Sequence, residues 1–93
     1  MSLSHLQVAF EQFHAENPHV YELFTRFSFE AIDRGRTRYS ARMVWSRMRW
    51  HVDFETTEES YKLNDHHTPY YARLFMADYP EHSEFFETRR VVA

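Results

Sequence analysis

Apolar residues recur with helical spacing most clearly between residues 18 and 35. They occupy positions i, i+3, i+4, i+7 and i+11, namely Val20, Leu23, Phe24, Phe27 and Ala31. Asn17 suits the N-cap, because its side-chain oxygen can accept from free amides of the first turn, and Pro18 suits the first helical position, where no amide is needed. Gly35 suits a left-handed C-cap. The sequence therefore predicts a helix that begins at Pro18 and is closed at Gly35.

The same kind of pattern predicts one helix before this segment and another after it. Residues 4 to 15 form the first predicted helix, which the break at Pro18 closes. Ser40 can cap a third helix that runs to about Val52. The apolar stripes are Leu6, Phe10 and Phe13 in the first helix, and Val44, Trp45, Met48 and Val52 in the third. The other face of the third helix carries arginines.

Two proline-marked helices are predicted in the C-terminal part of the chain. Thr68 and Pro69 repeat the cap-then-proline signal and open a fourth helix that ends before Pro80. Pro80 then opens a short last helix whose acidic and basic ends follow the order that the helix dipole favours. The residues concerned are Tyr71, Leu74 and Phe75 in the fourth helix, and Glu81, Glu84, Arg89 and Arg90 in the last.

Residues 53 to 64 have a different composition, with Thr, Tyr and Phe on either side of the turn-like Glu58-Glu59-Ser60. Such residues favour a short two-stranded hairpin over a helix. The predicted fold class is therefore mainly α with a small β-hairpin, in the order helix, helix, helix, hairpin, helix, helix. This is the element order of a winged helix-turn-helix, in which the second helix of the pair enters the major groove of DNA.

Composition narrows the class of protein. The 93 residues suit a single domain, and an aromatic content of 18 % predicts an aromatic-rich core. The absence of cysteine excludes disulfides, thiolate zinc sites and cysteine nucleophiles, and it fits a reducing compartment. The N-terminal segment does not resemble a signal peptide, and no run of residues suggests a membrane span. We therefore expect a cytoplasmic protein without a membrane partner.

The net charge of −3 hides a strong asymmetry along the chain. Between residues 34 and 52 the chain has six arginines and no acid, so the other residues carry 11 − 6 = 5 basic groups against 14 acidic ones. Charge position therefore says more here than total charge.

The arginines of this segment are the best candidates for a binding site. Arginine can bond two oxygens of a phosphate, or the O6 and N7 of guanine, at once. We predict that five of them bind nucleic acid, with DNA as the expected ligand: Arg36, Arg38, Arg42, Arg47 and Arg49. Trp50 and Tyr39 can stack on exposed bases if the ligand is single-stranded.

An alternative use of the arginines is pairing with acids or with another protein. Glu30, Asp33, Asp53 and Glu55 are available as internal partners. In the expected wing, Glu55, Glu58 and Glu59 would repel a phosphate backbone. The alternative function is thus a protein-binding module or inhibitor that acts on a host defence or replication protein. Tyr70 and Arg73 in the fourth helix are the candidate protein interface or homodimer seam.

Catalytic, metal and cofactor sites are not expected. One glycine cannot make a glycine-rich phosphate loop, and no serine lies in a nucleophile-elbow context. No His-x-x-x-His or His-Glu-x-x-His pair accompanies Asp65-His66-His67, so these residues are interpreted as a capping turn.

Four stretches of the chain resemble a family of small uncharacterised proteins of bacterial and phage genomes. They are residues 13 to 18 (FHAENP), 47 to 50 (RMRW), 61 to 64 (YKLN) and 69 to 75 (PYYARLF). The resemblance covers roughly residues 10 to 90. It implies a phage or prophage-associated setting, where small proteins are often DNA-binding regulators or inhibitors of host defence, and it brings no binding residues.

Overall fold

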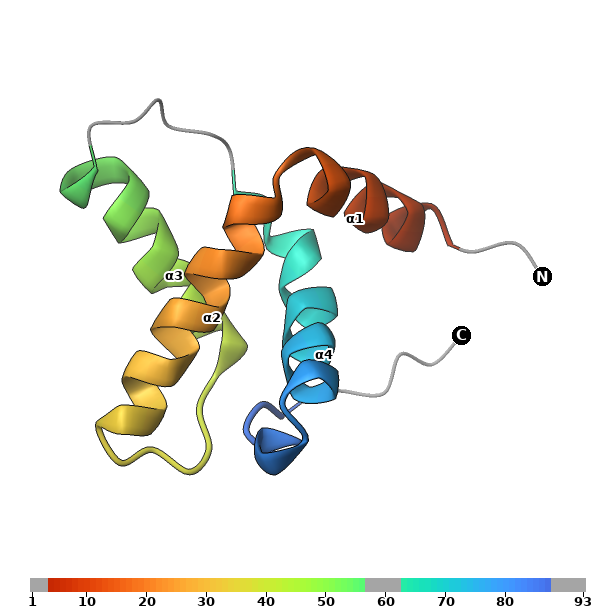
Figure 1. Cartoon of the computed structure of the whole chain (residues 1–93). Helices are drawn as coiled ribbons and strands as arrows, with labels where there is room; N and C mark the ends of the chain where they lie inside the picture. The colour runs from red at the N-terminus through yellow and green to blue at the C-terminus, as the bar shows by residue number, and fades with distance from the viewer. Residues whose placement is uncertain (1–3, 57–62, 88–93) are drawn as a thin grey trace.

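A computed structural model describes residues 4–56 and 63–87, and this part of the chain is mainly α-helical. The helix pair α2 and α3 lies beside α4, while α1 extends sideways from one end of this group (Figure 1). The elements are α1 (His5–Glu16), α2 (Pro18–Asp33), α3 (Ala41–Trp50), the π-helix η1 (His51–Glu55), the 3-10 helix η2 (Asp65–His67), α4 (Thr68–Asp78) and the 3-10 helix η3 (Pro80–His82). No helix of the described residues is long and apolar enough to cross a membrane.

The boundaries around α2 agree with the prediction, although the role of Asn17 differs. Its side-chain oxygen does not cap α2; instead its Nδ2 donates to the Phe13 carbonyl at 3.0 Å and closes α1. Gly35 has the predicted left-handed conformation, with φ of 96°. Its amide donates to the Ile32 carbonyl at 2.9 Å, and the Arg36 amide donates to the Ala31 carbonyl at 3.1 Å. The glycine thus ends α2 and turns the chain towards α3.

The predicted β-hairpin is not supported. Residues 53 to 55 belong to η1, which continues α3 by one wide turn, and residues 57 to 62 of the expected hairpin lie outside the described residues. Residues 53 to 55 are helical despite their strand propensity, because Val52, 5 % exposed, extends the buried stripe of α3 into the core. The bridge among the described residues is instead a parallel one between Tyr39 and Phe86.

The core is built from aromatic residues, as the composition predicted. Trp45 lies 5.8 Å from Tyr71, and Phe24 lies 5.4 Å from Phe86, between ring centroids. Leu6, expected on the apolar stripe of α1, is 41 % exposed. The residues of the buried cluster are Val20, Phe24, Phe27, Val44, Trp45, Met48, Val52, Leu63, Tyr71, Ala72, Phe75, Phe85 and Phe86.

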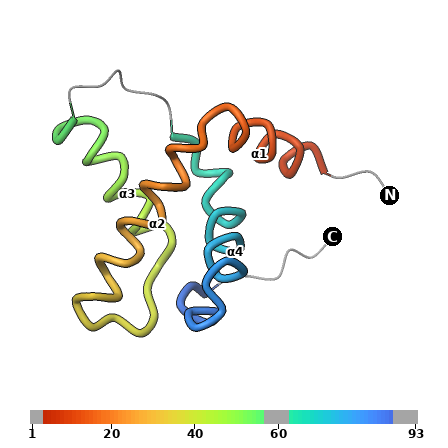
Figure 2. The backbone as a smooth tube through the Cα atoms, viewed as in Figure 1, coloured from red at the N-terminus to blue at the C-terminus, as the bar shows by residue number. Residues whose placement is uncertain are grey.

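The segment after α4 is less helical than predicted. Only η3 follows Tyr79 within the described residues, and Arg89 and Arg90 lie outside them. Phe85 and Phe86 then enter the core, and the Tyr39 amide donates to the Phe85 carbonyl at 3.0 Å. The tube drawing shows the result: the loop between α2 and α3 lies next to the η3 end, away from α1 (Figure 2).

Candidate functional site

The helix α3 has two faces that both carry large apolar side chains. Val44, Trp45 and Met48 point inward and are at most 1 % exposed. On the outer face, Met43 is 53 % exposed and Trp50 59 % exposed. Residues seven apart lie almost above one another on a helix, so these two residues form one row. The outer face therefore has an apolar centre that the core does not require.

The π turn η1 lengthens this row by a second aromatic residue. Phe54 is 70 % exposed, and its ring lies 4.7 Å from the Trp50 ring at an angle of 49°. Met43, Trp50 and Phe54 are called the apolar row below. Exposed residues of this size clustered on one face of a small protein are typical of a binding surface.

Arg47 lies on the α2 side of the apolar row and is held by its neighbours. Its guanidinium forms an ion pair with Glu55, and its carbon atom Cζ lies 4.4 Å from the centre of the Phe27 ring. The Arg47 hydrogen bond, then the Arg47 charge and His51, lower the pKa of the Glu55 carboxyl below its ordinary value. Arg47 is therefore already paired with an acid.

Arg49 lies on the other side and is paired as well. Its Nη2 donates to the Leu63 carbonyl at 3.0 Å and forms an ion pair with Asp65. These bonds join the end of α3 to the start of η2. Arg49 therefore fixes α3 to Leu63 and Asp65, which is a structural role.

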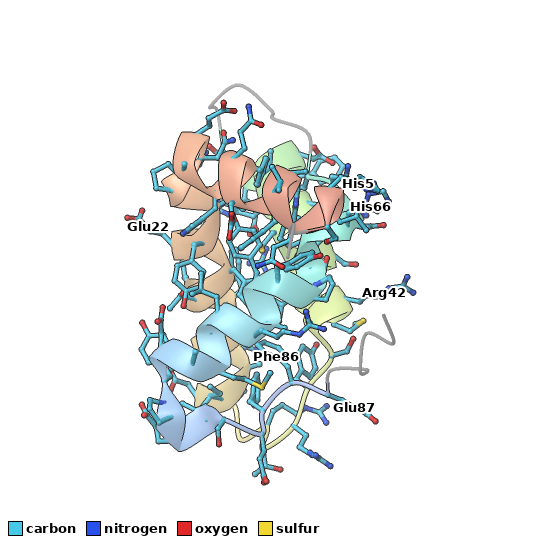
Figure 3. All side chains as sticks on the ribbon, turned by 90° about the vertical axis from the view of Figure 1, so that its right-hand side faces the viewer. His5, Glu22, Arg42, His66, Phe86 and Glu87 are labelled. Atoms are coloured by element: carbon cyan, nitrogen blue, oxygen red, sulfur yellow. The ribbon has the colours of Figure 1, made fainter. Side chains whose placement is uncertain are left out.

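The remaining three predicted arginines have no carboxylate within ion-pair distance in the described part of the chain. Arg42 is exposed in the first turn of α3 and points away from the helices (Figure 3). Arg36 lies with its Cζ 5.9 Å from the Tyr39 ring, and the Arg38 Nε donates to the Glu84 carbonyl at 3.5 Å. Among the other arginines of the segment, Arg34 pairs with Glu30 at 3.6 Å.

Of the two predicted interface residues of α4, Tyr70 packs against α1 and Arg73 lies beside Tyr70. Tyr70 is half-buried and stacks on Phe10 at 5.0 Å with 17° between the rings. Arg73 lies with its Cζ 5.8 Å from the Tyr70 ring. The ring of Tyr70 is thus largely covered by this chain itself.

The histidine turn, residues 64 to 67, helps to fix α1. The Asn64 side chain accepts from the His66 amide at 3.0 Å, which gives the predicted capping turn. His67 is 7 % exposed and stacks on Phe13 at 4.4 Å, while its Nδ1 has no hydrogen-bond partner among the described residues. Burial, and then the charge of His66, lower the pKa of His67. The described residues contain no group of three or more His, Asp or Glu side chains that could hold a metal ion.

Sequence reasoning named Trp50 as a possible stacking residue but missed Met43 and Phe54. Their spacing, with residues 43, 50 and 54 all opposite the buried stripe, is the signal that could have found them. The assignment of Phe54 to a hairpin concealed it. A comparison of the chain with protein-family models, curated proteins and solved structures gives no match.

Proposed function

We propose that this protein binds nucleic acid through the loop between α2 and α3 and the first turn of α3. The observation that carries the proposal is the set of three arginines without a carboxylate partner in the described part of the chain: Arg36, Arg38 and Arg42. Guanidinium groups that pair with no carboxylate of residues 4–56 and 63–87 suit phosphate oxygens. The three arginines lie within seven residues of one another, so one stretch of nucleic-acid backbone can contact all three.

The pairing of Arg47 and Arg49 moves the centre of the proposed site towards the N-terminal end of α3. Both ion pairs are substantially exposed, with side chains 36 % to 57 % accessible. Exposed pairs of this kind contribute about 1 kcal/mol or less. A phosphate can therefore compete for Arg47, while the bond of Arg49 to the Leu63 carbonyl favours its structural role.

The proposed mode of binding differs from winged-helix docking. The hairpin that would form the wing is not supported by the described residues, and Glu55, expected there, pairs with Arg47. The proposal therefore uses the helix and the preceding loop and needs no wing. It includes no catalytic step, and the phage or prophage setting stays a prediction.

The experiment is a fluorescence-anisotropy titration of labelled duplex and single-stranded DNA at two salt concentrations. Three phosphate contacts give roughly a 20- to 40-fold loss of affinity between about 50 and about 200 mM salt. The variant Arg38→Ala/Arg42→Ala should reduce both the affinity and its salt dependence. The control Arg26→Ala/Arg73→Ala removes the same charge from α2 and α4 and should bind as the wild type apart from a small general charge effect. Absence of binding to either DNA at low salt would overturn the proposal.

The second candidate is a protein-binding module, which the apolar row favours. Trp, Met, Phe and Arg are enriched at the centres of protein interfaces. Met43, Trp50 and Phe54 would form such a centre, with the ion pairs of Arg47 and Arg49 at its rim. Binding to a protein through this centre should depend little on salt, which separates it from phosphate binding.

A further inference from the structure

We infer that the nucleic acid is single-stranded and that a base stacks on Trp50; this inference rests on the proposed function. The outer face of α3 carries Arg42 in its first turn, and the apolar row of Met43, Trp50 and Phe54 lies beside it. Phosphate-binding groups thus stand beside open aromatic rings, which is the combination that single-strand-binding proteins use.

The accessibility of the rings favours a single strand over a duplex. Trp50 and Phe54 are 59 % and 70 % exposed, so most of each ring is open to solvent. In a duplex the faces of the bases are covered by their neighbours, and a protruding ring reaches them only by unstacking the helix. A single strand presents these faces without that cost.

Phe54 contributes by its position beside Trp50. The two ring centres are 4.7 Å apart and the rings are tilted by 49°, so they make one continuous apolar surface with two orientations. Phe54 follows Trp50 by four positions, so it lies on the same face of the helix and next to Trp50.

The charges along this face of α3 determine where the bound strand lies. Arg42 lies eight residues before Trp50, which is about 12 Å along the helix. Asp53 lies beyond Trp50 at the other end, where Glu55 is paired with Arg47. Phosphates are attracted to the Arg42 end and repelled from the Asp53 end, so the strand should run from the basic loop to Trp50 and stop there.

Tyr39, the other stacking residue predicted from the sequence, does not offer an open ring. It is half-buried, its amide is bonded to the Phe85 carbonyl, and the Arg36 guanidinium lies near its ring. The inference therefore assigns stacking to Trp50 and leaves Tyr39 in the core packing.

The two tryptophans make a direct test possible. Trp45 is 1 % exposed and Trp50 is 59 % exposed, so a base that stacks on the surface should quench Trp50 and leave Trp45 unchanged. The wild type is titrated with unlabelled oligothymidylate, with a mixed single strand, and with the duplex form of that strand, while tryptophan emission is recorded. The same titrations are repeated by anisotropy with labelled strands.

The variants are Trp50→Leu and Phe54→Ala, with Val8→Ala as a control at an exposed apolar residue of α1. We expect tighter binding of single strands than of the duplex, quenching of the wild type, and roughly a 5- to 100-fold loss of affinity in Trp50→Leu. The control should bind as the wild type. Thermal unfolding of each variant shows that the loss is not a loss of fold.

The other outcomes separate the inference from the proposed function. If duplex and single strands bind equally and Trp50→Leu binds normally, nucleic-acid binding stands and the stacking inference is wrong. If neither strand form binds, both are wrong. If the Trp50 emission shifts to the blue as the protein alone is concentrated, the ring is buried in a second copy of the chain, and the inference is overturned in favour of self-association.

Discussion

Trp45 and Trp50 lie five residues apart in one helix, yet their surroundings have almost nothing in common. Trp45 is 1 % exposed and packs between Phe24 and Tyr71, whereas Trp50 is 59 % exposed and contacts Phe54. A surface helix needs one apolar stripe to join a core. The second stripe on α3 adds nothing to that core, so a structural role does not account for it, and it is the surface to which we assign binding.

Removing each tryptophan in turn tests most directly whether Trp45 and Trp50 differ in their contribution to stability. Trp45→Ala should lower the free energy of unfolding by about 3–5 kcal/mol, because it leaves a cavity in the centre of the aromatic cluster. Trp50→Ala should change it by no more than about 0.5 kcal/mol, because an exposed side chain is lost. Urea unfolding followed by circular dichroism measures both. Equal losses would mean that Trp50 also supports the fold.

Lowering the pH should reduce stability through the buried His67 more than through an exposed histidine. The pKa of His67 is lowered below its ordinary value of 6.5, so the folded state binds fewer protons than the unfolded state. Its contribution to stability is then intact above pH 6.5 and is lost as the pH falls below that value. When His67 is charged, its buried ring stacks on Phe13 and its Nδ1 has no acceptor in the described part of the chain, so α1 should loosen.

The measurement is the melting temperature at pH 7 and pH 5. We expect the decrease in the wild type to be larger than in His67→Phe, which keeps the stacking on Phe13 without a titratable group. The control His5→Gln removes an exposed histidine and should behave as the wild type. An equal decrease in His67→Phe would assign the acid sensitivity to other groups.

Local signals in the sequence predicted the helices well, since Pro18, Gly35 and Pro69 act on their own backbone. The hairpin prediction is not supported at residues 53 to 55, because strand propensity is a weak, context-dependent preference. The burial of Val52 instead continues the helix. Contacts between residues far apart in the sequence could not be predicted from local patterns. The bond from Arg49 to Asp65 spans 16 positions, so the sequence could suggest that arginines pair with acids but not which ones do.

A smaller effect on stability should distinguish Arg49, which is bonded to Leu63 and Asp65, from Arg42, which has no carboxylate partner among the described residues. Arg49→Ala should lower the free energy of unfolding by about 1 kcal/mol, because it removes the bond to the Leu63 carbonyl and the ion pair with Asp65. Arg42→Ala removes the same charge from the same helix and should have no measurable effect on the free energy of unfolding. Urea unfolding of the pair tests this, and equal stability of the two variants would contradict the structural role of Arg49.

The smallest expected effect concerns Glu55, which holds Arg47 at the edge of the apolar row. Glu55→Gln removes a carboxylate beside Trp50 and Phe54 and frees the Arg47 guanidinium for a phosphate. The affinity for a single strand should rise about twofold, as expected for removal of one charge at about 10 Å in water. Glu11→Gln, on α1, changes the net charge equally and should leave the affinity nearly unchanged. A decrease in Glu55→Gln would instead mean that the carboxylate orients Arg47 for binding, and the site would then include the ion pair itself.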